Sequence, residues 1–493
     1  MLVSILLFVL INLIIALTSV LICLLLGVRN KFVFPVAIII IYFSLIVFAM
    51  TVLGLFNILN IRNYILWVII LFVLVLSLFL KHCHNYNNLV TSIRKLFRNI
   101  ALYKKILFCI AIILLMFWAA RIIVTPVWDY DSLAYHMPFV AQFIQDGSIN
   151  NIYFTALSGP LGYYPSNIEI IFASYLLIFN HDSILHLINL LLIICYGFAL
   201  GAILRELKIS LPIIILAILA FLTIPVYLFQ IGTLKIDNLF TFIFVSIILF
   251  LFRYYSQRKL SDLLLFSLGC GIFMGSRYLA VPYILLPLLF ILVIFVVDFI
   301  RRDKKVVIRN FVLLMLIILL FGGFWYIRNF LVTKNPMFPT SVSFLGQNIF
   351  LGLNDTFSGG GMVTTSIFAN IGDLINVKNF IGHYLFETGF TAFICFIFLI
   401  LALIFIKKIF FEFKDLLFNF IIIGIPLYFL YYLCSPNSFV HLNQNIRYSL
   451  PFLFLCLLGI VFIDKKLNKG FVNKFLFCAL GGIGTGDWRR SCD

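Results

Sequence analysis

The chain has 493 residues, of which 64% are hydrophobic and only 11% are charged. Soluble domains are about 45–50% apolar and about 25% charged, so this composition excludes an ordinary soluble protein. The formal net charge of +17 would suit a nucleic-acid-binding protein, but the lysines and arginines gather in short loops between apolar runs, as in membrane proteins. We therefore expect an all-α, polytopic membrane protein that works in a lipid bilayer and has no nucleic-acid partner.

Apolar runs of about 17–25 residues are long enough to cross a bilayer as helices. Three such runs, residues 2–28, 32–59 and 64–80, open the chain and are followed by a strongly basic stretch. Clustered lysines and arginines mark a cytoplasmic loop. We expect residues 1–105 to form an N-terminal extension of three spans that ends in this basic cytoplasmic loop.

A fourth apolar run, residues 106–124, carries the chain to the opposite face and into a polar loop at about residues 125–167. This first exterior loop contains Asp129 and Asp131 and has no lysine or arginine. Polar, irregular chain is not tolerated against lipid, so it belongs in water or against protein. Apolar side chains at helical spacing over residues 135–144 predict a helix that lies along the membrane surface.

The rest of the chain alternates between the two faces. Residues 168–179 are too short to span and indicate a re-entrant or interfacial helix, and a second long exterior loop is expected at about residues 328–385. This pattern gives about 13–14 spans and places most of the basic residues in the cytoplasm. Residues 106–483 then form a second transmembrane unit, and residues 484–493 form an atypical tail that suggests truncation.

Several motifs on the exterior face occur in a fixed order. Residues 131–138 are followed by Tyr164-Pro165, by residues 223–237, by residues 325–339 and by residues 447–451. In type, order and placement these motifs resemble those of the C-type (GT-C) glycosyltransferases. That family of polytopic membrane enzymes includes the protein O-mannosyltransferases and the bacterial aminoarabinose transferases of lipid A. The resemblance covers about residues 106 to 463 and implies a GT-C-like fold.

The resemblance also implies a reaction. The donor would be a sugar on a polyprenyl phosphate or diphosphate, and the acceptor a hydroxyl group of a glycan, a lipid or a protein. Transfer with inversion would occur on the outer face of a bacterial cytoplasmic membrane. The Asp-x-x-x-Tyr spacing puts Asp131 at the family's catalytic position, and Asp129 would support it. Some relatives carry Arg and Lys where this chain has Ala134 and Tyr164, so the donor phosphate must find its cations elsewhere.

Charged residues near bilayer depth are costly and usually functional, and phosphate groups favour Arg or Lys. Arg277 and Arg447 lie between apolar spans on the side of the first exterior loop; interfacial anchoring remains open for both, and more so for Arg328. Asp237 is either a second acidic site residue or a helix N-cap, and His136 binds phosphate or hydrogen-bonds within the loop. The predicted substrate-binding residues are Arg447, Arg277, His136, Tyr135, Tyr164, Asp237 and Arg328.

We expect no cofactor and no metal, because two neighbouring carboxylates alone make a thin site for a divalent cation. Two other functions stay open. A lipid-linked oligosaccharide polymerase or ligase would use the same donors, but would depend on exterior Arg and His in a late loop. A transporter or flippase would show inverted repeats with broken helices in matching positions. The early acidic loop favours the transferase.

Overall fold

The computed structural model describes residues 2–82, 122–153, 160–344, 347–353, 366–389 apart from 371 and 373, 416–435 and 445–467, and a few residues between 113 and 120. Nearly all of the regular structure in these residues is helical, and seven of the helices are long and apolar enough to cross a membrane. This confirms the expected class, an all-α polytopic membrane protein. The expected runs at 106–124 and 386–406 lie mostly outside the described residues, and the tail at 484–493 lies wholly outside them, so the total of about 13–14 spans stays a prediction.

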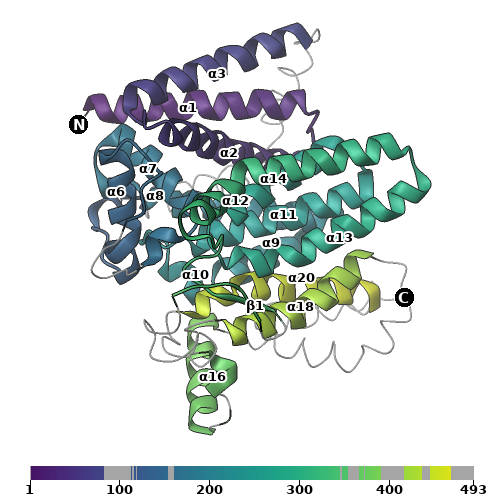
Figure 1. Cartoon of the computed structure of the whole chain (residues 1–493). Helices are drawn as coiled ribbons and strands as arrows, with labels where there is room; N and C mark the ends of the chain where they lie inside the picture. The colour runs from purple at the N-terminus through teal and green to yellow at the C-terminus, as the bar shows by residue number, and fades with distance from the viewer. Residues whose placement is uncertain are drawn as a thin grey trace.

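The three predicted N-terminal spans are helices α1 (Leu2–Leu25), α2 (Val33–Leu55) and α3 (Ile61–His82). They pack on one another at one side of the molecule, as Figure 1 shows. Helix α2 ends where Asn57 takes a left-handed conformation with φ of 59°, which asparagine tolerates better than most residues. The basic stretch that follows α3 lies outside the described residues.

The first exterior loop forms short helices, as predicted. A π-helical turn, η1 (Ser132–His136), leads into α6 (Met137–Gln145), and a 3-10 turn, η2 (Pro160–Tyr163), leads into α7 (Asn167–Phe179). Helix α6 buries Phe139, Val140 and Phe143. Helix α7 is almost wholly buried and packs on α1, α2 and α6, which agrees with its being too short to span.

The central bundle is formed by the helices from α8 to α14, after the short turn η3 (Asp182–Ile184) (Figure 1). Helix α11 lies at its centre, and 89% of the residues in its most apolar 18-residue stretch are buried inside the protein. Helices α12 and α14 approach closely through glycines, since a β-carbon at Gly322 would lie 2.6 Å from the Gly271 carbonyl oxygen. The bounds are α8 (Leu187–Glu206), α9 (Leu211–Leu222), α10 (Pro225–Phe229), α11 (Asp237–Gln257), α12 (Leu260–Met274), α13 (Ala280–Arg301) and α14 (Lys304–Thr333).

Two boundaries differ from the sequence prediction. Helix α14 has 30 residues and ends at Thr333, so Arg328 lies within a helix and does not open the second exterior loop. A two-stranded antiparallel hairpin, β1 (Val342–Phe344) and β2 (Gln347–Phe350), follows and is a small exception to the all-α expectation. The remaining elements are α15 (Ile367–Asn370), α16 (Leu374–Thr388), α18 (Leu416–Cys434), η4 (Ile446–Ser449) and α20 (Leu450–Leu467).

Charged residues collect at both ends of the central bundle. At one end Arg253 pairs with Glu206 and Asp262, near the end of α11. At the other end α11 begins with Asp237, which pairs with Arg277. A helix of 21 residues is about 30 Å long, so the two groups are separated by about the thickness of a bilayer core. The chain path predicted from the sequence places the same two charged groups on opposite faces of the membrane. The first exterior loop lies at the end of the bundle that carries Asp237.

Candidate active site

Four chain segments that are far apart in sequence meet at the Asp237 end of the bundle. Asp131 directly precedes η1, and Asp237 is the first residue of α11. Arg277 lies in the turn between α12 and α13, and Arg447 lies in η4 before α20. Because helices present their ends to the membrane surface, these short connections bring the charged side chains of distant segments together.

The four side chains form one chain of ion pairs, which we call the charge cluster. A terminal nitrogen of Arg447, Nη2, lies 2.5 Å from Asp131 Oδ2, and its Nε lies 3.3 Å from Asp237 Oδ2. The other oxygen of Asp237 accepts a hydrogen bond from Arg277 Nη1 at 2.9 Å. All four residues are buried, with exposed fractions of 9% for Asp131, 3% for Asp237, 8% for Arg277 and 4% for Arg447. Buried charges need such partners, since an unpaired one is strongly destabilising.

The cluster fixes the protonation of Asp131 and Arg447. Burial alone would raise the pKa of the Asp131 carboxyl, but Arg447, with smaller contributions from Lys235 and Arg277, outweighs burial, and the pKa lies below its ordinary value. Burial would lower the pKa of Arg447, but Asp237 and then Asp131 raise it well above its usual range. At neutral pH Asp131 is therefore a carboxylate and Arg447 a cation.

Aromatic side chains surround the two guanidinium groups. The ring of Tyr448 lies 5.5 Å from the Arg277 guanidinium and 5.3 Å from that of Arg447, within cation–π range. Arg277 also donates a hydrogen bond to the Tyr135 hydroxyl at 3.3 Å. Tyr164 packs on Tyr278 with ring centroids 5.0 Å apart. Tyr448 and Tyr135 therefore contact the predicted cations, whereas Tyr164 packs on Tyr278.

A small cavity of about 10 Å³ lies inside the cluster, between Asp237, Arg277 and Arg447. A space of this size holds roughly one water molecule, so a sugar phosphate does not fit inside. On the Asp131 side of the cluster the loop carries Trp128 and Tyr130, whose side chains are both exposed.

Asp129 makes different contacts from those of Asp131. Its Oδ1 accepts a hydrogen bond from the backbone N–H of Ser132 at 3.1 Å, and its other oxygen accepts one from the Ser132 hydroxyl. The same hydroxyl accepts the backbone N–H of Leu234 at 2.9 Å. Asp129 therefore holds the start of η1 against the segment before α11. In η1 the Met137 N–H bonds to the Ser132 carbonyl, a π-helical turn of a kind often found at functional sites.

His136 is placed beside the cluster but pairs elsewhere. Its Nδ1 lies 2.8 Å from Glu169 Oε1, and both side chains are buried. Glu169 was missed in the sequence analysis, although it is the one charged residue of an otherwise apolar helix, α7. That contrast is a usable signal, because an ionisable side chain in an apolar helix needs a partner. The pair orients His136 and joins the loop to α7.

Arg328 does not join the charge cluster. It donates hydrogen bonds to the carbonyl oxygens of Gly162 at 2.9 Å and Ile149 at 3.5 Å, and its guanidinium stacks on the Trp325 ring at 4.8 Å. These contacts bind the middle and the later part of the first exterior loop to α14. These contacts give Arg328 a role in anchoring the loop, and its predicted contact with a substrate stays a prediction.

Replacing Arg328 by Met should loosen the first exterior loop, because two buried carbonyl groups lose their charged donor. The expected cost is about 1–3 kcal/mol of stability, seen as a lower midpoint of thermal unfolding and faster proteolysis within residues 125–167. Arg62→Met, at an exposed arginine at the start of α3, is the matched control and should change neither. Equal protease resistance of the two variants would contradict the anchoring role.

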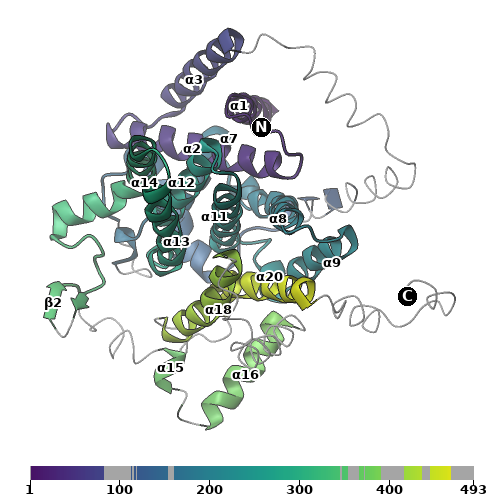
Figure 2. The ribbon, with the colours of Figure 1, turned by 90° about the vertical axis from the view of Figure 1, so that its right-hand side faces the viewer.

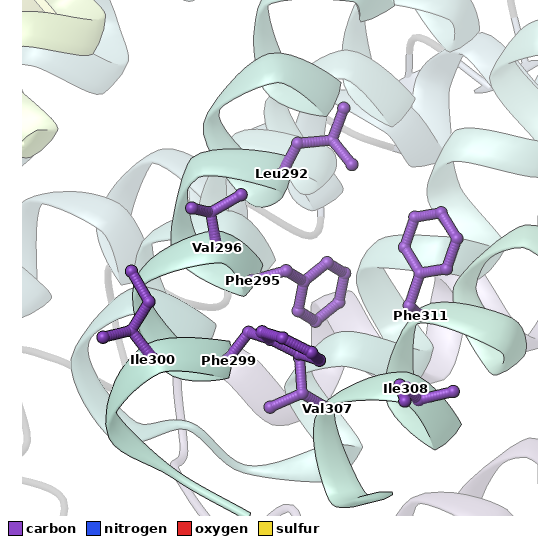
Figure 3. A pocket seen from close by; sticks show the side chains of 8 residues that line it. All are labelled: Leu292, Phe295, Val296, Phe299, Ile300, Val307, Ile308 and Phe311. Carbon is purple, nitrogen blue, oxygen red and sulfur yellow. The ribbon is translucent and has the colours of Figure 1, made fainter. Parts of the chain in front are cut away.

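A larger groove lies at the far end of the molecule. It measures about 340 Å³, is lined by apolar side chains of α13 and α14, and is shown in Figure 3. Phe295 of this groove is 15 residues beyond Ala280 at the start of α13, about 22 Å along the helix from the charge cluster. The groove is thus separate from the candidate site.

Among the residues that the structure describes, no group of three or more His, Cys, Asp or Glu side chains is arranged to hold a metal ion. Asp131 and Asp237 are instead bound to arginines, and Asp129 to Ser132. Comparisons of the chain with protein-family models, with curated proteins and with solved structures found no match.

Proposed function

We propose that the protein is an inverting, GT-C-like glycosyltransferase that moves a sugar from a polyprenyl-phosphate donor to an acceptor hydroxyl on the outer face of the cytoplasmic membrane. The observation that carries the proposal is the Asp131–Arg447 contact of 2.5 Å in a buried cluster with Asp237 and Arg277. A carboxylate beside two arginines supplies, in one place, a proton acceptor and the cations that a phosphate leaving group requires.

The chemistry needs one base and a stabilised leaving group. As the acceptor oxygen bonds to the anomeric carbon, its proton passes to the Asp131 carboxylate. The bond between the anomeric carbon and the phosphate oxygen breaks, and the phosphate keeps the electron pair. Arg447 and Arg277 offset that charge. Because phosphate leaves as an anion, no second carboxylic acid is needed, unlike in glycoside hydrolysis.

The surroundings of the cluster suit a donor with a lipid tail. Arg277 lies just before α13, whose exposed face carries Leu285, Leu289 and Leu292, as expected where a lipid chain lies alongside the protein. A lipid-linked donor also removes the need for a nucleotide-binding domain, and the sequence has no glycine-rich nucleotide-binding fingerprint.

The test is a transfer assay with the full chain in lipid nanodiscs. Polyprenyl-phosphate donors carrying different labelled sugars are offered with glycolipid, glycan and peptide acceptors, and the anomeric configuration of the product is determined by NMR. The expected product has the configuration opposite to that of the donor. Retention of configuration would contradict a single displacement, and movement of an intact donor across proteoliposomes without bond cleavage would favour a flippase.

A further inference from the structure

Lys235 is a third cation beside the charge cluster, and its position is fixed by its neighbours. The backbone N–H of Leu234 bonds to the Ser132 hydroxyl at 2.9 Å, and Asp237, two residues later, bonds to Arg277. The Lys235 side chain is half-buried. Within the described part of the chain its ammonium group has no hydrogen bond or ion pair, whereas Arg277 and Arg447 are both held by carboxylates.

The charged groups of the same cluster act electrostatically on the Lys235 ammonium group. Burial lowers the pKa of its ammonium group and Arg447 lowers it further, while Asp131, Asp129 and Asp237 act in the opposite direction. The result is a pKa below the ordinary value for lysine. A half-buried cation attracts an added anion more strongly than a fully exposed cation does, because partial desolvation strengthens the attraction.

Helix α16 brings a carboxylate to the same place. It packs on α10 and η4, and Figure 2 shows it at the edge of the molecule beside α18. Its end is close to α10, since a β-carbon at Gly389 would lie 3.3 Å from Pro225. Burial raises the pKa of Glu387 in the last turn, and His383 and Lys235 act against that rise. Glu387 is therefore within electrostatic reach of Lys235.

We propose that Lys235 binds the phosphate group of the anionic lipid substrate directly, and that the negative charge of Glu387 on α16 weakens this binding. This inference rests on the proposed function and names a binding residue for it. Arg447 and Arg277 keep their bonds to Asp237, whereas Lys235 has no short-range partner to give up. Between the described side chains of Glu387 and Lys235 there is no hydrogen bond or ion pair, but the negative charge of Glu387 opposes an incoming phosphate.

The test measures binding of decaprenyl phosphate, and of uncharged decaprenol, to the full chain in nanodiscs of neutral lipid. Lys235→Gln should weaken binding of the phosphate roughly 10- to 100-fold, the range for a lost hydrogen bond to a charged group, and leave decaprenol binding unchanged. Lys235→Arg should retain most of the affinity. Glu387→Gln should strengthen phosphate binding a few-fold. Lys334→Gln, at an exposed lysine after α14, is the control for lost charge and should stay within twofold of the unchanged protein.

The outcomes separate this inference from the proposed function. If the unchanged protein binds decaprenyl phosphate no better than decaprenol, the donor class itself is wrong. If it prefers the phosphate but Lys235→Gln binds as tightly as Lys334→Gln, only the role of Lys235 is overturned. Weaker phosphate binding in Glu387→Gln would overturn the opposing role of Glu387.

Discussion

Replacing Asp131 by Asn should abolish sugar transfer while donor binding is kept or becomes tighter. The amide cannot take the acceptor proton, and loss of a positioned base costs roughly 10²–10⁴-fold in rate. In the structure the Asp131 carboxylate lies on Arg447, where it competes with a phosphate for the same guanidinium. Removing its negative charge makes the cluster more cationic, so the donor phosphate should bind at least as well.

The measurement pairs the turnover rate with donor affinity for the same purified variant. Asp146→Asn is the control, because Asp146 is an exposed carboxylate of the same loop. Asp129→Asn should be milder than Asp131→Asn, since an asparagine oxygen still accepts the Ser132 N–H. Near-normal turnover in Asp131→Asn would refute the base assignment, and an inactive Asp129→Asn beside an active Asp131→Asn would show that the other carboxylate is the base.

The members of the charge cluster were visible in the sequence. Asp237, Arg277 and Arg447 each lie beside a hydrophobic run, where an ionisable side chain costs free energy and usually has a function. Asp131 stood out instead as a carboxylate in the polar first exterior loop. The short helices of the first exterior loop were equally readable, since the spacing of Phe139, Val140 and Phe143 is helical. Local patterns of this kind are set by neighbours in the chain.

The partners within the site were not predictable in the same way. The contacts of Asp237 with Arg277 and Arg447 depend on how α11, α13 and η4 pack. No local sequence pattern encodes that packing. The hydrogen bonds from Arg328 to backbone carbonyl groups depend on the path of the first exterior loop. The position of Arg328 was also obscured by the length of α14, which continues past Gly322, where α12 packs closely, and ends at Thr333.

Replacing Arg447 by Gln should damage both folding and function, and a second substitution separates the two effects. Arg447 contacts Asp131 and Asp237, so the single variant leaves buried carboxylates with too few cations. Removing one partner of a buried ion pair costs about 3–5 kcal/mol, and the thermal unfolding midpoint should fall clearly. The double variant Arg447→Gln with Asp131→Asn restores the charge balance and should recover most of that stability.

The double variant then isolates the contribution of Arg447 to donor binding. Its proper reference is Asp131→Asn alone, because both proteins lack the base and neither transfers sugar. If Arg447 contacts the donor phosphate, the double variant should bind a polyprenyl-phosphate sugar about tenfold or more weakly than Asp131→Asn, the lower range for a lost charge-assisted hydrogen bond. Equal donor affinity of these two folded proteins would show that Arg447 serves only to hold Asp131 and Asp237. The phosphate would then have to be bound by Arg277 and Lys235, and Arg277→Lys in the Asp131→Asn background would be the variant that loses affinity.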